Sequence, residues 1–213
     1  MEVSMKKQLF SAILFLAVSL FFFSFSPAFG QKSRAEELKE MVTTAKITLT
    51  EALNTALKTA PGKAVAGELE KEKGKLIFTF DILPSISSSI ITEVQVDAIT
   101  GKVISQAEEK IKAEEEEEEK EEKKGEKEEA EKEEPKSSLQ EIVAAAKISL
   151  PEALKAAQAA VSGTVIAAEL EKEKGKIIFS FDILPTPGSQ IIQEVHIDAL
   201  TGKVIAKEEE KIK

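Results

Sequence analysis

The chain contains no cysteine, tryptophan or tyrosine, and it has a single histidine. Without cysteine, it can form no disulfide framework, thiol nucleophile, cysteine metal site or lipid-modified cysteine. It also lacks an H-E-x-x-H zinc motif, a nucleophile elbow and a phosphate-binding loop. We therefore expect no enzyme, no catalytic residues, no metal ligands and no cofactor.

An excess of basic residues is also missing. The 29 lysines and arginines are outnumbered by 38 acidic residues, which gives a net charge of −9. An acidic chain repels nucleic-acid phosphates, and no aromatic platform is present on which bases could stack. We therefore expect no nucleic-acid partner.

Long hydrophobic runs are absent beyond the first thirty residues. Residues 1–30 have the parts of a signal peptide: Lys6 and Lys7, an apolar run over residues 9–25, and small residues at Ala28 and Gly30. The alternative is an uncleaved anchor, because a run of about 17 residues is at the short limit for spanning a bilayer. We favour cleavage before Gln31, which predicts an exported protein, periplasmic or extracellular, with no membrane association after cleavage.

The rest of the chain is a tandem duplication. Residues 45–112 and 146–213 align without a gap, and more than half of the aligned positions are identical. We assign a first domain to residues 31–112, a linker to 113–136 and a second domain to 137–213. Domains of this size bury a modest share of their surface, and we expect each to close its own core.

Each repeat has the pattern of one helix followed by about four strands. The helix begins at an S/T-x-x-E capping box, Thr48–Glu51 in the first copy and Ser149–Glu152 in the second. Alternation predicts strands over 65–71, 76–83 and 90–96, with a short fourth strand at 103–104. Tight turns are predicted at Asp97, Gly101, Asp198 and Gly202. The fold class is therefore α+β, with one helix packed on an antiparallel sheet in each repeat.

The linker is acidic and has no apolar face. Residues 114–119 are six glutamates, followed by mixed Glu and Lys with favourable i,i+4 pairs such as Glu116/Lys120. A solvated, coiled-coil-like helix and a charged disordered spacer both fit this composition. Either would keep the two domains apart. Weak binding of divalent cations is an alternative use of the run, although it lacks the spacing of a calcium loop.

Few side chains could do acid–base chemistry. His196 aligns with Gln95, on the strand face away from the predicted core, and we expect it to be a surface residue. Repeated carboxylates occur at Asp81 and Asp182, near a predicted strand end, and at Glu93 and Glu194 on the outer face. Nothing in the sequence marks a pocket around them, so we assign them no catalytic role.

The repeated motifs resemble the PepSY family. The resemblance rests on the helix openings ITLTEAL and ISLPEAL, the ELEKEKGK strand, and above all EVQVDAITGKVI and EVHIDALTGKVI. It implies a small α+β domain without catalytic residues. The family occurs in propeptides of thermolysin-type proteases and in many exported bacterial proteins, where it is thought to inhibit or modulate proteases. This chain has no attached protease, so any inhibition would act in trans.

Two functions remain open. The first is a binding or regulatory module for an exported protein, such as a protease, using the connections between the second and third strands. These are the segments in which the copies differ most, and their candidate residues are Pro84, Ser85, Ile86, Ser87, Pro185, Thr186, Pro187 and Gly188. The second is a cation- or envelope-binding module that uses the acidic linker and strand faces.

Overall fold

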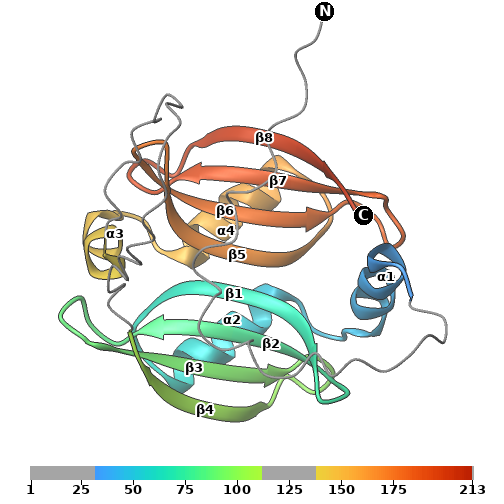
Figure 1. Ribbon diagram of the computed structural model, residues 1–213, viewed down its shortest axis with the longest axis horizontal. Helices are drawn as coiled ribbons and strands as arrows, with labels where there is room; N and C mark the ends of the chain where they lie inside the picture. Colours follow the sequence, from blue (N-terminus) through green and yellow to red (C-terminus); the bar gives the residue numbers. More distant parts are fainter. Residues whose placement is uncertain (1–31, 112–137, 213) are drawn as a thin grey trace, which may run out of the picture.

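The computed structural model describes residues 32–111 and 138–212, and in each of these parts two helices precede four strands (Figure 1). The first part contains α1 (Arg34–Thr44), α2 (Leu49–Thr59), β1 (Lys63–Glu72), β2 (Lys75–Leu83), β3 (Ile90–Asp97) and β4 (Val103–Lys110). The second contains α3 (Leu139–Ala145), α4 (Leu150–Ala160), β5 (Thr164–Glu173), β6 (Lys176–Leu184), β7 (Ile191–Asp198) and β8 (Val204–Lys211). The α+β fold class is confirmed. The predicted signal peptide and linker lie outside the described residues.

Helices α2 and α4 begin at the predicted capping boxes. The backbone N–H of Thr48 donates to Glu51 Oε2 at 2.8 Å, and the Glu51 N–H donates to the Thr48 hydroxyl at 3.2 Å. In α4, the Glu152 carboxylate accepts from the backbone N–H of Ser149 at 2.7 Å. These bonds satisfy backbone donors that have no partner inside the helix.

Both helices pack on the same face of the sheet (Figure 1). In α2 the residues at helical spacing, among them Leu49, Leu53 and Ala56, are buried. They cover the alternating face of β2 that carries Phe78 and Phe80, which are 1% and 0% exposed. Alanines in the helix stripe let it approach the sheet closely, as the narrow apolar stripe in the sequence indicates.

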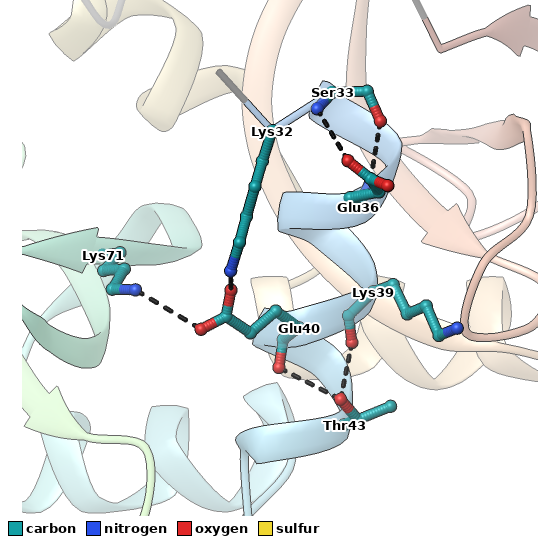
Figure 2. Close-up of polar contacts among 7 residues, drawn as sticks. All are labelled: Lys32, Ser33, Glu36, Lys39, Glu40, Thr43 and Lys71. Atoms are coloured by element: carbon teal, nitrogen blue, oxygen red, sulfur yellow. Dashed lines mark hydrogen bonds and ion pairs between the residues drawn. The ribbon is translucent and has the colours of Figure 1, made fainter. Parts of the chain in front are cut away.

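Each repeat also has a leading helix that begins at its own capping box. The N–H of Ser33 donates to Glu36 in α1, and the N–H of Ser138 donates to Glu141 in α3 (Figure 2 for α1). Figure 2 also shows Glu40 of α1 pairing with Lys71 of β1 at 3.5 Å. Each repeat therefore has a second helix, before the one that the sequence pattern predicts.

The eight strands form one continuous sheet in the order β4-β3-β2-β1-β5-β6-β7-β8 (Figure 1). The two repeats join where β1 pairs with β5 in antiparallel fashion, with Ala66 opposite Glu169, Gly67 opposite Ala168 and Glu68 opposite Ala167. Gly67 and Ala168 are equivalent residues of the two copies. The join is therefore a pseudo-two-fold axis, as in a symmetric dimer.

The expectation that the linker keeps the domains apart is wrong. Most buried hydrophobic side chains of both repeats belong to one hydrophobic core. The physical reason is the edge strand: β1 of one repeat and β5 of the other each present unpaired backbone groups, and pairing them satisfies both edges. The same duplication that suggested two independent units supplies two complementary edges.

The leading helices lie where β1 and β5 diverge from their short pairing, at opposite ends of the junction (Figure 1). Helix α1 contributes Leu38 and Met41 to a hollow that is also lined by Ile166 of β5. At the other end, Lys63 of β1 donates to the carbonyl oxygen of Val143 in α3 at 3.2 Å. Each leading helix thus contacts both repeats.

The fourth strands are longer than predicted. The sequence pattern indicated a short strand at residues 103–104, whereas β4 continues to Lys110 and pairs with β3 from Ile90 to Val96. Strand β8 does the same beside β7. Edge strands bury few side chains, so their residues need not alternate between apolar and polar. The charged sequences of β4 and β8 therefore did not indicate the full length of these strands.

Candidate functional site

The predicted binding loops lie at the surface. In the β2–β3 loop, Pro84 to Ser87 are exposed, and Ile86 at the tip is 53% exposed. In the β6–β7 loop, Pro185 is half-buried, whereas Thr186, Pro187 and Gly188 are exposed. Pro187 aligns with Ile86, so both loops present an apolar residue at the same place.

The two loops share a backbone frame although their sequences differ. The N–H of Ser88 donates to the Ser85 carbonyl oxygen at 3.0 Å, and the N–H of Ser189 donates to that of Thr186 at 3.0 Å. In each loop the serine hydroxyl also donates to a carbonyl oxygen two residues on, at 2.8 Å for Ser88 and 2.7 Å for Ser189. A fixed frame with variable side chains is typical of a recognition loop.

The structure does not bring the two loops together. The first lies beside α3, where Gln140 Nε2 donates to the Ser88 carbonyl oxygen at 3.1 Å. The second lies beside α1, where a Cβ atom placed on Gly188 would meet Lys39 Cδ at 3.5 Å. These positions are at opposite ends of the sheet (Figure 1). Each loop therefore borders the leading helix of the other repeat.

The predicted turn residues close the third and fourth strands. Asp97 Oδ1 accepts from the N–H groups of Ile99 at 3.0 Å and Thr100 at 2.7 Å, and Gly101 has a φ of 69°. Asp198 makes the equivalent bonds in the second repeat. Hydrogen bonds to the ionised carboxylate lower the pKa of both aspartates. These residues hold the turn, and nothing around them indicates a ligand.

A set of carboxylates, here called the acidic face, lies on the sheet surface opposite α2 and α4. Its members alternate along the strands with core residues: Glu68, Glu70, Asp81, Glu93, Glu169, Glu171, Asp182 and Glu194. Asp81 lies near the end of β2, as predicted, and is paired with Ala66 and Glu93. Alternation in ELEKE is the signal that could have placed Glu68 and Glu169 here.

The middle of the acidic face lies on the junction between the repeats. Ala66 pairs with Asp81 on one side and with Glu169 on the other. By the pseudo-symmetry, Ala167 pairs with Asp182 and with Glu68. Four carboxyl groups therefore flank two alanines across the join.

Burial and mutual repulsion hold these groups towards their neutral forms. Burial, followed by the neighbouring carboxylates, raises the pKa of Glu169 to about 8 and that of Glu68 to about 7. The pKa values of Asp81 and Asp182 rise to about 6 for the same reasons. Arg34 of α1 opposes the shifts of Glu68 and Asp182. In residues 32–111 and 138–212, no group of His, Asp and Glu side chains is arranged to hold a metal ion.

The prediction that His196 is a surface residue is wrong, because its exposed fraction is 6%. It lies on the sheet face opposite the helices, as expected. Its strand, β7, is an interior strand with β6 on one side and β8 on the other. Its Nδ1 is 3.3 Å from Glu173 Oε2, and its Nε2 is 3.0 Å from Glu194 Oε1. These two side chains and the adjoining strands cover the ring.

Among the helices that the structure describes, none is long and apolar enough to cross a membrane.

Comparison with known proteins identifies both repeats. The model of the PepSY family, described as the "Peptidase propeptide and YPEB domain", matches residues 46–107 and again residues 147–208. A search of curated proteins finds no match. Among solved structures, the chain is similar to a candidate lipoprotein from Clostridium difficile, at 17% identity and a TM-score of 0.41, covering 80% of this chain and 97% of that one. A TM-score of this size supports no inference about function. The two family matches cover more than half of the sequence, and the chain belongs to the PepSY family as a tandem of two such domains.

Proposed function

We propose that this chain is an exported, non-catalytic binding module that recognises a partner protein through loops 84–89 and 185–190. The observation that carries the proposal is the shared loop frame, which presents Ile86 and Pro187 at equivalent exposed tips. A hydrogen-bonded loop loses little conformational freedom on binding, so an exposed apolar tip can contribute its burial to affinity.

The partner class we propose is an exported protease, inhibited or modulated in trans. The family description names peptidase propeptides, and the residues at 1–30 have the composition of an export signal. The compartment is then the periplasm or the extracellular space. Because the loops lie at opposite ends of the sheet, one partner domain would contact one loop, and both loops could be occupied at once.

The experiment is a pull-down from the exported fraction of the source cell, with residues 31–213 as bait. Two further baits carry Gly/Ser replacements of loop 84–89 or of loop 185–190. A matched control bait carries Ile99→Ser and Leu200→Ser, because these exposed apolar residues lie in the β3–β4 and β7–β8 turns. The captured protein is then purified, and its affinity and protease activity are measured against all four baits.

The proposal predicts a partner that the wild type and the turn control bind equally and that at least one loop variant binds about tenfold or more weakly. Truncating an anchor residue at an interface typically costs at least this much. The loop assignment is overturned if no protein is captured, or if the loop variants bind as the wild type does.

The alternative is binding of cations or of the cell envelope by acidic segments. The acidic linker lies outside the described residues, and the acidic face holds no group arranged for a metal. The same pull-down, repeated with chelator and with 0.5 M salt (about a threefold rise above physiological ionic strength), distinguishes the two. Capture that is indifferent to the loops and lost under these conditions would favour the alternative.

A further inference from the structure

His196 and Gln95 occupy the same position in the two repeats and contact the same pair of glutamates. In the first repeat, Gln95 Nε2 donates to Glu72 Oε2 at 2.8 Å and to Glu93 Oε1 at 3.1 Å. In the second, His196 approaches Glu173 and Glu194 at 3.3 Å and 3.0 Å. Glu173 aligns with Glu72, and Glu194 aligns with Glu93. The contact reaches across β6 and ties β7 to the end of β5.

The two side chains differ in their donors. The glutamine amide carries two hydrogens on one nitrogen, and it can donate to both glutamates at any pH. A neutral imidazole has one N–H, whereas the imidazolium has two. The neutral ring can therefore donate to only one of the two glutamates. When the ring is protonated, its hydrogen bond to Glu194 is charge-assisted and its contact with Glu173 is an ion pair.

We propose that His196, Glu173 and Glu194 form a pH-responsive contact between β5 and β7, here called the clasp. Both of its interactions are present in acid, and one of them is lost when the imidazole loses its proton. Gln95 keeps the same clasp closed in the first repeat at every pH. This inference does not depend on the identity of a binding partner.

The charged groups that act on the ring are three glutamates, which favour the protonated form. Glu171 and Glu173 face it from β5 and Glu194 from β7, while Ser180 of β6 is bonded to Glu171. Opposite His196 on β8 lies Ala206, which carries no charge. Lys174, in the β5–β6 turn, interacts with Glu173, Glu194 and Glu208.

The sign of the pH effect follows from these contacts. The hydrogen bond to Glu194, together with the charges of the glutamates, outweighs the burial of the ring and raises the pKa of His196 above its ordinary value of 6.5. A folded-state pKa above the unfolded one means that the stabilisation is complete below about pH 6.5. It is lost as the pH rises through the folded pKa.

The first measurement is an NMR titration of the full chain, in which the single histidine gives one unambiguous set of imidazole signals. The second is hydrogen exchange of the backbone amides of β7 and β3 in the same sample between pH 6 and pH 9, corrected for the intrinsic rate. The acidic face titrates differently in the two repeats, because burial raises the pKa of Glu93 on β3 to about 7 whereas the hydrogen bond from His196 lowers that of Glu194. The ratio of β7 protection to β3 protection is therefore compared between the wild type and His196→Gln, in which both repeats carry glutamine.

The clasp predicts a titration midpoint above 6.5 and a β7-to-β3 protection ratio that falls by about tenfold over this range, the size of one charge-assisted hydrogen bond. His196→Gln should remove the change, and Gln95→His should create the opposite change in β3. Because each variant copies the other repeat, both should fold. A midpoint at or below 6.5, or a ratio that His196→Gln leaves pH-dependent, would overturn the inference.

Discussion

At the scale of the residue, Gly62 lies between α2 and β1, at a position that has no room for a side chain. A Cβ atom at this position would lie 2.6 Å from the carbonyl oxygen of Leu83, which is a backbone atom of β2 and cannot rotate away. Gly163 has the same surroundings, 2.5 Å from the oxygen of Leu184. The close approach of helix end and strand therefore requires glycine here.

We expect Gly62→Ala to lower the free energy of unfolding by about 1–3 kcal/mol, as overpacking does. The control is Gly74→Ala, in the β1–β2 turn, where nothing lies within 4 Å of the added Cβ and the φ of +79° is the source of strain. That strain should cost about 1 kcal/mol. Urea unfolding of the three proteins checks the order, and a smaller loss for Gly62→Ala than for Gly74→Ala would contradict the steric argument.

Some single residues could be placed from the sequence and others could not. Asp97 and Gly101 were predicted as turn residues because their chemistry acts on the neighbouring backbone. The burial of His196 could not be predicted, since it depends on two glutamates from different strands. Asp81 could be placed near the end of its strand, but its place among carboxylates of both repeats could not be predicted, because it depends on the pairing of β1 with β5.

At the scale of the element, the pairing of β1 with β5 places carboxylates of both repeats next to each other. Folding brings Glu68 and Glu169 out of water and beside other acidic groups, so the folded chain holds protons that the unfolded chain has released. Their pKa values rise from 4.5 to about 7 and about 8. Stability must therefore fall as the pH rises from about 4.5 to about 8.

The double variant Glu68→Gln with Glu169→Gln should be more stable than the wild type at pH 8, by at least about 1.4 kcal/mol, the equivalent of one pKa unit. At pH 5 the gain should be much smaller, because the folded carboxyls are then neutral and the unfolded ones have only begun to ionise. Denaturant unfolding between pH 5 and pH 8.5 measures this. Glu108→Gln, an exposed residue on β4, is the control; an equal gain in that variant, or none in the double variant, would refute the account.

The presence of helices and strands could be predicted from the sequence better than their lengths. The capping box at Thr48 and the alternation in β2 and β3 predicted these elements because each signal is local. Helices α1 and α3 have the same S-x-x-E signal at Ser33 and Ser138, but their short apolar stripes gave little support. Strand β4 was predicted too short because its backbone pairing with β3, and not an apolar pattern, determines its length.

At the scale of the whole molecule, the tandem repeat is one body. The pseudo-two-fold join gives a single eight-stranded sheet, places the two loops at its opposite ends and shares each leading helix between the repeats. The sequence could not predict the pairing of β1 with β5, because the residues of a free edge strand do not indicate which strand it will pair with. The small residues Ala66, Gly67 and Ala168, which permit a close join, also fit an ordinary edge strand.

The most direct test of this architecture uses the absence of cysteine from the chain. Glu68→Cys with Ala167→Cys places two thiols at directly paired positions of β1 and β5, where Cβ atoms lie about 5 Å apart. Glu70→Cys with Ala167→Cys shifts the first thiol by two residues, beyond the paired segment. Both pairs are oxidised mildly at low protein concentration, and the intramolecular disulfide is quantified by mass spectrometry.

One continuous sheet predicts near-complete cross-linking of the 68/167 pair and little cross-linking of the 70/167 pair. The first disulfide should also leave the thermal unfolding temperature unchanged or raise it. Equal and slow cross-linking of both pairs would mean that the repeats move independently on their linker, and it would contradict the joined architecture.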